Sequence, residues 1–587
     1  MVSSLVQTSL LILALCLVPV YFSEFASYQL GLFLIYGLAA QSVGWLWGKT
    51  NILSLGQALF FGGAAYSAAM IMRYASDPSL QGLFIIMAIV IIALLAFLLA
   101  SLVFQGSSDS GAYFSLITLA LVMIMEQVVS ASTEFTGGFN GFSGYPVPDM
   151  LDPFGNLYYI IVIATTLITG LLLYLNTLPA DLVLRALADN EPRMQLFGFA
   201  TYTIKAIAFA TSAIIAAVAG VLFAFHQGIV TPSSTSFTLS AELVIFAAVG
   251  GRIHPLGPLI GAVGVGWLTL ELRDSFAYWE LLIAIVFIVI VLRSPGGLIS
   301  LLSIIPNRLN WRVKSNKHPT KNHLTINPPL AIKRASGALK FQKVGLTLGV
   351  VNILNEVNFT TPEAGVLCLI GPNGAGKTSA FNLITGQLPT TSGSISFAKN
   401  NIHSRPTYLA LNAGIGRKMQ VPSIFPSLSI DENMTVATLA QRAKGLHFFQ
   451  PKTCTWRTPY LVQLQEQYQT LLPTQGVNKA GELPQGHKQL LEFIMTICAE
   501  PALLLLDEPC AGLSQNETQL MIDLVKHYQE HKQGLIIIIE HDMSIVEALA
   551  EEVLVLHQGS LLASGSYNSV KLDVKVQAVY AGGTKVC

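Results

Sequence analysis

The stretch Val366-Leu-Cys-Leu-Ile-Gly-Pro-Asn-Gly-Ala-Gly-Lys-Thr378 decides the fold of the second half of the chain. Its first five residues are apolar and predict a short buried strand. The next eight match the pattern G-x-x-x-x-G-K-[S/T], in which glycines let the backbone wrap around phosphate and present N–H groups to it. Residues 379–384 predict a helix that Gly386 ends. The expected phosphate contacts are Gly371, Pro372, Asn373, Gly374, Ala375, Gly376, Lys377, Thr378 and Ser379.

A second strand supports this nucleotide site. Residues 503–506 are four leucines, and Asp507 and Glu508 follow them directly. In the loop, Lys377 can reach the β- and γ-phosphates and the Thr378 hydroxyl can bind Mg²⁺. Asp507 suits the magnesium shell, and Glu508 suits positioning or deprotonating an attacking water. The sequence therefore predicts an α/β domain that hydrolyses ATP with Mg²⁺.

The composition of the whole chain is that of a protein partly embedded in lipid. Of 587 residues, 52% are hydrophobic and 11% are charged, against roughly 25% charged in an ordinary soluble domain. This hydrophobicity excludes a disordered chain, and six cysteines are too few for a disulfide scaffold. The formal net charge is zero, so nothing global indicates a nucleic-acid partner.

The charges are distributed unevenly. Residues 1–305 hold 8 basic and 14 acidic residues, a net of −6, and the rest holds 25 and 19, a net of +6. A helix needs about 20 apolar residues to cross a bilayer. The charge-poor half therefore predicts an all-α polytopic membrane domain over residues 1–305, with about 8–10 spanning or re-entrant helices. The apolar runs are 5–22, 28–47, 83–104, 112–129, 157–175, 206–225 and 274–292.

Two further apolar stretches, residues 51–72 and 239–272, are interrupted by glycine and proline. Such segments are typical of discontinuous helices that line a solute path in transporters. Small residues that permit close helix packing are an equal alternative.

A basic segment separates the two halves. Residues 306–343 hold nine basic residues and no acidic one, which is typical of a cytoplasmic segment that faces anionic membrane lipid. We therefore predict a cytoplasmic linker over residues 306–337 and a cytoplasmic ATP-binding domain over residues 338–587. A nucleic-acid-binding arm is the alternative, but the position beside a membrane helix already accounts for the charge.

Over residues 338–587 the chain resembles an ATP-binding cassette (ABC) ATPase. The resemblance implies that Gln420 is the lever glutamine at the Mg²⁺ site, and that His541 acts with Glu508 and Gln420 in catalysis. The resemblance also implies that each ATP is held between two such ATPases, by one phosphate loop and the other subunit's signature. The signature here is Leu483, Pro484, Gln485, Gly486 and His487.

This signature departs from the family pattern at Pro484, where the family has serine, and at His487, where it has glutamine. Proline has neither hydroxyl nor N–H, so a contact to the γ-phosphate is missing. A hydrogen bond to a charged group contributes about 1.5–3 kcal/mol, so ATP capture at that face could weaken about ten- to a hundredfold. Alternatively, Gly486 and the helix dipole are sufficient to bind the γ-phosphate without the serine. We expect two unequal ATP sites in the assembly.

Over residues 28–302 the chain resembles permeases of branched-chain amino acid and urea uptake systems. The resemblance rests on stretches such as Trp47-Gly-Lys-Thr-Asn-Ile-Leu-Ser-Leu-Gly-Gln57 and Glu242-Leu-Val-Ile-Phe-Ala-Ala-Val-Gly-Gly-Arg252. It implies a fused permease and ATPase subunit of an importer in the bacterial cytoplasmic (inner) membrane. The implied partners are a second permease, a second ABC ATPase and an extracytoplasmic solute-binding protein. The charged loop over residues 179–203 is where such importers carry the coupling helix that docks on the ATPase.

The substrate is less determined by these resemblances. The stretches Gly414-Ile-Gly-Arg-Lys-Met-Gln420 and Gly486-His-Lys-Gln-Leu-Leu-Glu492 resemble the urea type of cassette. Urea or a short amide is therefore the favoured cargo, and a branched-chain amino acid is the alternative. An exporter half-transporter is a further alternative, although only 22 charges in residues 1–305 and the glycine-broken segments disfavour it.

Overall fold

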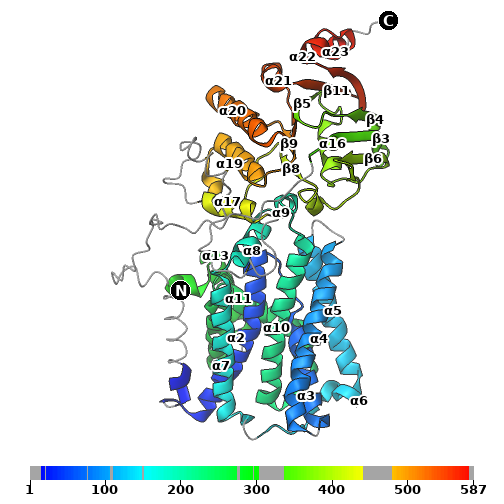
Figure 1. The fold of residues 1–587 in the computed structure, drawn as a ribbon. Helices are drawn as coiled ribbons and strands as arrows, with labels where there is room; N and C mark the ends of the chain where they lie inside the picture. Colours follow the sequence, from blue (N-terminus) through cyan, green and yellow to red (C-terminus); the bar gives the residue numbers. More distant parts are fainter. Residues whose placement is uncertain are drawn as a thin grey trace. The chain divides into compact units, whose positions relative to one another are not determined.

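The computed structural model describes residues 15–19, 21–75, 77–105, 110–148, 151–273, 278–294, 296–302, 336–440, 448, 460, 464 and 479–580. The chain forms two compact units (Figure 1). The helical unit comprises Met1–Leu184 and Tyr202–Asn322, and the α/β unit comprises Arg185–Thr201 and His323–Cys587. In the predicted apolar run 5–22, residues 5–14 and 20 lie outside the described residues, and in the predicted linker 306–337 all residues before 336 do.

The helical unit confirms the predicted polytopic membrane domain. Within the described residues, five helices are long and apolar enough to cross a bilayer. In the most apolar of them, α4, the buried side chains are Ala96, Ala100 and Phe104, so most of its surface is apolar and suited to lipid. The five are α2 (Glu24–Thr50), α4 (Pro78–Gln105), α5 (Ser110–Ala131), α7 (Asn156–Leu175) and α10 (Thr201–Gln227).

Shorter elements complete the described part of this unit. Two short strands, β1 (Phe142–Ser143) and β2 (Ile229–Val230), pair antiparallel. The helices are α3 (Gln57–Tyr74), α6 (Thr133–Thr136), η1 (Gly138–Asn140), η3 (Pro232–Thr235), α11 (Phe237–Gly250), α12 (Leu256–Arg273), α13 (Trp279–Arg293) and α14 (Leu298–Leu302).

Both interrupted stretches contain real helix breaks. α2 ends at Thr50 and is followed by its C-cap Asn51, which has a left-handed φ of 57°, and α3 begins at Gln57. The second stretch breaks between α11 and α12. There a side chain on Gly250 would collide with the Gly257 carbonyl, so close backbone packing requires the glycine.

The α/β unit is built on two sheets. The larger has the order β12-β11-β5-β10-β9-β8, and only β12 in it is antiparallel. Its strands are β5 (Gly365–Ile370), β8 (Ile415–Lys418), β9 (Leu503–Asp507), β10 (Leu535–Ile539), β11 (Glu552–His557) and β12 (Ser560–Gly565). The smaller, antiparallel sheet has the order β4-β3-β6-β7, from β3 (Leu339–Leu348), β4 (Val351–Thr360), β6 (Ser392–Phe397) and β7 (Asn400–Asn401).

Helices accompany these sheets. Two of them, α17 and α20, begin with a reciprocal capping box, Ser429 with Glu432 and Ser514 with Glu517. The helices are α9 (Glu191–Leu196), α16 (Lys377–Ile384), η4 (Thr407–Leu409), α17 (Ile430–Leu439), η6 (Ala480–Glu482), α19 (Gln485–Cys498), α20 (Gln515–Lys532), α21 (Met543–Leu549), α22 (Tyr567–Lys571) and α23 (Val574–Tyr580). One more helix, α8 (Pro179–Asp189), runs across residue 185, where the sequence ranges of the two units change.

Parallel pairing determines where the functional side chains can meet. Strands β5, β10 and β9 are fully buried because every residue but Gly365 and Asp507 is apolar. Parallel strands end at the same edge of a sheet, where ligands bind in such folds. The segments that follow β5, β8, β9 and β10 therefore gather at one edge.

Candidate nucleotide site

The phosphate loop joins β5 to α16, as predicted from the sequence. Gly374 and Gly376 have φ values of 82° and 100°, which favour glycine. A Cβ on Gly376 would also lie 2.6 Å from a methyl carbon of Leu354. α16 starts at Lys377, so its free N–H groups point into the loop, where an anion binds well.

Lys377 is folded over the loop. Its Nζ donates to the carbonyl oxygens of Gly371 at 2.7 Å and of Pro372 at 3.0 Å. Burial lowers the pKa of the Lys377 ammonium, and the nearby carboxylates of Glu508 and Asp507 oppose that shift. The two carbonyl oxygens therefore hold the Lys377 ammonium at the position where the loop is predicted to bind phosphate.

A cleft of about 530 Å³ opens beside this loop. It brings together residues from six separate parts of the sequence, including all three predicted catalytic side chains. Its lining is Val351, Asn352, Ile353, Asn373, Gly374, Ala375, Gly376, Lys377, Thr378, Ser379, Gln420, Glu508, His541 and Gln558.

Glu508 lies at the centre of the predicted catalytic residues. Its Oε2 accepts a hydrogen bond from Gln420 Nε2 at 3.0 Å, and its Oε1 lies 3.1 Å from His541 Nε2. Its backbone φ is 45°, which a glutamate adopts at a cost, and strain of this kind clusters at functional sites. Its N–H donates to the Ile539 carbonyl of β10 at 2.9 Å, so neighbouring strands hold this conformation.

The two carboxylate oxygens of Asp507 differ in their hydrogen bonding. Oδ2 accepts from Arg417 Nη2 at 3.2 Å, while Oδ1 is buried and accepts no hydrogen bond from any described residue. Burial raises the pKa of Asp507, and the Arg417 charge opposes that shift. An unsatisfied carboxylate oxygen fits Mg²⁺, which prefers carboxylate and hydroxyl oxygens. Asp507 and Thr378 would hold the ion, with Gln420 beside them in the cleft lining.

Glu540 is a supporting residue to which the sequence assigned no role. It is 5% exposed. Its Oε1 accepts from the Cys510 N–H at 3.0 Å and its Oε2 from the His541 N–H at 3.3 Å. The carboxylate thereby joins the segment after β9 to the segment after β10, and so fixes His541 relative to Glu508. In the sequence, the position of Glu540 directly after a buried strand is the signal that could have indicated this role.

The predicted signature residues lie apart from this cleft: none of the five is among the described residues that line it. Pro484 is the N-cap of α19, with φ −56° and ψ 156°. Serine, asparagine and aspartate are preferred at an N-cap because their side chains accept a first-turn N–H, and proline lacks that acceptor. Gly486 packs against Glu517, whose carboxylate would be 2.1 Å from an added Cβ.

The charged stretch between α7 and α10 is where the family resemblance predicts a coupling helix that docks on the ATPase. Residues Arg185–Thr201 belong to the α/β unit, although they lie between two membrane-spanning helices in the sequence. Asp189 accepts from the Ser427 N–H at 2.7 Å, and Asn190 Nδ2 donates to Ser423 Oγ at 3.0 Å. Arg185 pairs with Glu432 at 2.8 Å.

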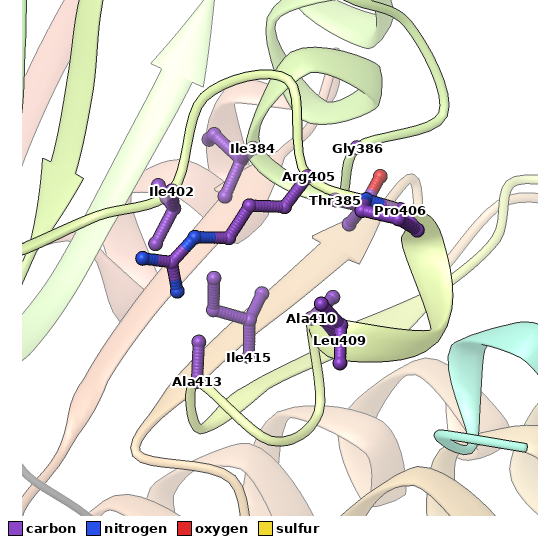
Figure 2. Close-up of a pocket in the computed structure, with 10 residues that line it drawn as sticks. All are labelled: Ile384, Thr385, Gly386, Ile402, Arg405, Pro406, Leu409, Ala410, Ala413 and Ile415. Atoms are coloured by element: carbon purple, nitrogen blue, oxygen red, sulfur yellow. The ribbon is translucent and has the colours of Figure 1, made fainter. Parts of the chain in front are cut away.

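A second hollow in this unit is too small for a nucleotide. Figure 2 shows it beneath the Arg405 side chain. Its volume is about 10 Å³, which is room for about one water. The lining is Ile384, Thr385, Gly386, Ile402, Arg405, Pro406, Leu409, Ala410, Ala413 and Ile415.

Comparison with known proteins agrees with this geometry. Residues 25–292 match the family described as the permease component of the branched-chain amino acid transport system, and residues 354–511 match the ABC transporter family. The chain is 31% identical over 242 residues to the high-affinity branched-chain amino acid transport ATP-binding protein LivG of Salmonella typhimurium, covering 40% of this chain and 94% of LivG.

Two further similarities are of the same kind. The corresponding ATP-binding protein BraF of Pseudomonas aeruginosa is 31% identical over 249 residues, covering 40% of this chain and 96% of BraF. A solved nucleotide-free ATP-binding cassette from an ABC transporter is 25% identical, covers 42% of this chain and 99% of its own, and has a TM-score of 0.35. The chain therefore belongs to the ABC transporter family of the branched-chain amino acid type and joins its permease and its transport ATPase in one polypeptide.

Proposed function

We propose that this chain is the fused permease and ATPase subunit of an importer for a small neutral solute, with urea or a short amide favoured. The observation that carries the proposal is the cleft in which the phosphate loop, Gln420, Glu508 and His541 meet. The described residues of the same chain also include five helices able to span a membrane. ATP hydrolysis in that cleft would drive transport through the helical unit.

The proposed hydrolysis uses positioning and charge. The phosphate-loop N–H groups and Lys377 bind the phosphates, and Glu508 orients the attacking water and accepts its proton. His541 and Gln420 both contact the Glu508 carboxylate and keep it aimed into the cleft. When bound, Mg²⁺ neutralises charge that develops on the phosphates.

The position of the signature supports a second ATPase as partner. Residues 483–487 do not line the cleft formed by their own described chain, so another subunit would have to complete it. Importers of this family work with further subunits and a binding protein. We therefore propose a second permease, a second ABC ATPase and an extracytoplasmic solute-binding protein as partners, in a bacterial inner membrane.

Neutral polar groups inside the helical unit support an uncharged cargo. The buried amide oxygens of Gln41 and Gln57 accept no hydrogen bond from the described residues. Free acceptors of this kind match the N–H groups of urea or an amide. The names of the relatives favour a branched-chain amino acid, which is therefore the competing cargo.

Uptake by the reconstituted complex should decide between these cargoes. Proteoliposomes that contain the chain, its partner subunits and the solute-binding protein are expected to accumulate radiolabelled urea when ATP is supplied to the ATPase side. Vesicles with the Glu508→Gln variant are the matched control, in which no ATP-driven uptake is expected. Accumulation of leucine without urea would show that the proposed cargo is wrong.

Pro484→Ser tests the proposed inequality of the two ATP sites. Serine restores a hydroxyl and an N–H, and each hydrogen bond to a charged phosphate contributes about 1.5–3 kcal/mol. The variant is expected to raise turnover and to lower the half-saturating ATP concentration about tenfold.

Pro484→Ala is the matched control, because it restores the N–H without the hydroxyl. An intermediate effect in this control would divide the gain between the two groups. Unchanged turnover and ATP dependence in Pro484→Ser would remove the idea of a weakened site.

A further inference from the structure

Arg193 is a fully buried arginine in a segment that joins two membrane-spanning helices in the sequence. It lies on α9, and its exposed fraction is 0%. Arginine is almost never fully buried unless it is paired. The Asn190 side chain caps α9 by accepting from the Arg193 N–H at 3.0 Å, so the start of the helix places this residue.

The guanidinium of Arg193 makes four hydrogen bonds to other described residues. Nη1 donates to the Arg417 carbonyl at 2.8 Å and to Glu492 Oε1 at 3.2 Å. Nη2 donates to Thr496 Oγ1 at 2.7 Å and to the Glu492 carbonyl at 3.3 Å. The Phe197 ring lies 4.4 Å from the guanidinium carbon. A planar fork suits this arrangement, and an ammonium does not reproduce it.

Glu492, the partner of Arg193, also accepts a hydrogen bond from the backbone of the residue that precedes Gln420. Its exposed fraction is 0%, and the same Oε1 accepts from the Met419 N–H at 2.9 Å. Its Oε2 lies 3.9 Å from the Lys418 ammonium. One buried carboxylate therefore joins Arg193 to the residue immediately before Gln420.

Arg417 extends the contact to the proposed metal site. Arg193 holds its carbonyl, and its own guanidinium donates to Asp507 Oδ2 at 3.2 Å. The same guanidinium donates to Asn382 Oδ1 at 2.7 Å and to Gln387 Oε1 at 2.8 Å, so its position is closely determined. Residues 417–420 thus connect Arg193 to two carboxylates. Arg417 contacts Asp507 at one end of this segment, and Gln420 contacts Glu508 at the other.

We propose that Arg193 is a positioning residue through which the Arg185–Thr201 segment sets the geometry of Asp507 and Gln420, and hence the affinity of the ATP site for Mg²⁺. The inference rests on the proposed function, since it gives the segment its role in coupling transport to hydrolysis. Coupling of this kind is reciprocal, so metal-loaded nucleotide would in turn tighten the seating of α9.

The test is a magnesium titration of the full complex with two readouts, ATPase activity and the Mg²⁺-dependent binding of a fluorescent ATP analogue. Arg193→Met removes the fork and retains apolar bulk. The Mg²⁺ concentration for half-maximal activity is expected to rise about tenfold, because loss of groups that orient metal ligands typically costs about 10- to 100-fold in metal affinity. Stimulation of the ATPase by solute-loaded binding protein is expected to disappear in the same variant.

Arg185→Met is the matched control. It removes another ion pair of the same segment, that with Glu432, which is partly exposed and does not involve residues 417–420. Its Mg²⁺ dependence is expected to stay at the wild-type value. An equal shift in both variants would mean that loose attachment of the segment causes the effect, and would overturn the specific role of Arg193.

The double variant Arg193→Met with Glu492→Gln separates the positioning role of Arg193 from the cost of leaving the Glu492 charge buried and unpaired. The glutamine amide oxygen can still accept from the Met419 N–H, and Lys418 keeps its hydrogen bond to Gln489 Oε1. Removing both charges of a buried ion pair is often neutral for stability. The double variant is therefore expected to assemble and still to show the weakened Mg²⁺ response. A wild-type Mg²⁺ response in the double variant would overturn the proposal.

Arg193→Lys keeps the test decisive if the methionine variant does not assemble. It keeps the charge and loses the fork, so the same shift is expected at smaller size, and its absence would overturn the proposal. Failure of the proposed function would look different, because the wild-type complex would then show no stimulation by solute-loaded binding protein.

Discussion

Glu508→Gln is expected to lower ATP hydrolysis by the assembled complex at least about 100-fold, since a positioned general base typically contributes about 10²–10⁴. The amide has the shape of the carboxylate and can still contact Gln420 and His541, which lie 3.0 Å and 3.1 Å from it. It cannot accept a proton from water. ATP binding is expected to remain, because the phosphate loop is unchanged.

Steady-state phosphate release and binding of a fluorescent ATP analogue measure the two parts of this expectation separately. Glu530→Gln is the matched control, because Glu530 lies on the exposed face of α20 and does not line the cleft. Hydrolysis within a few-fold of wild type in Glu508→Gln would assign the proton acceptor to another group.

Lys377→Ala is expected to weaken ATP binding about 10- to 100-fold, and hydrolysis is expected to fall with it. The ammonium is held over the loop by the Gly371 and Pro372 carbonyls, and each of its bonds to phosphate contributes about 1.5–3 kcal/mol. Burial lowers the Lys377 pKa, and the nearby carboxylates of Glu508 and Asp507 oppose that shift.

Equilibrium titration of the complex with ATP measures this effect, and Lys526→Ala on the exposed face of α20 is its control. Retained ATP affinity in Lys377→Ala would mean that the backbone N–H groups alone bind the phosphates. The two variants should thus separate binding from chemistry, with Lys377 required for the first and Glu508 for the second.

Local patterns in the sequence determined the elements of both units. The apolar run 366–370, the glycine loop and the leucine run 503–506 each predicted a strand or loop that the structure contains. Five apolar runs likewise correspond to five long helices. These predictions succeeded because glycine conformation, apolar periodicity and uncharged length act within a few neighbouring residues.

The meeting of Gln420, Glu508 and His541 required the parallel order of β8, β9 and β10, which the sequence did not show. Strand order depends on packing between distant segments, so the lone histidine after β10 acquired its contact with Glu508 only in the folded sheet.

The sequence by itself determined the nucleotide chemistry and the membrane-spanning character, because each is written in contiguous residues. Only the tertiary structure decided that Arg193 is paired with Glu492 and bonded to the carbonyl of Arg417. In the sequence Arg193 is one charge in a charged loop. A buried ion pair between residues 299 positions apart depends on mutual desolvation and geometry, and no local pattern records these.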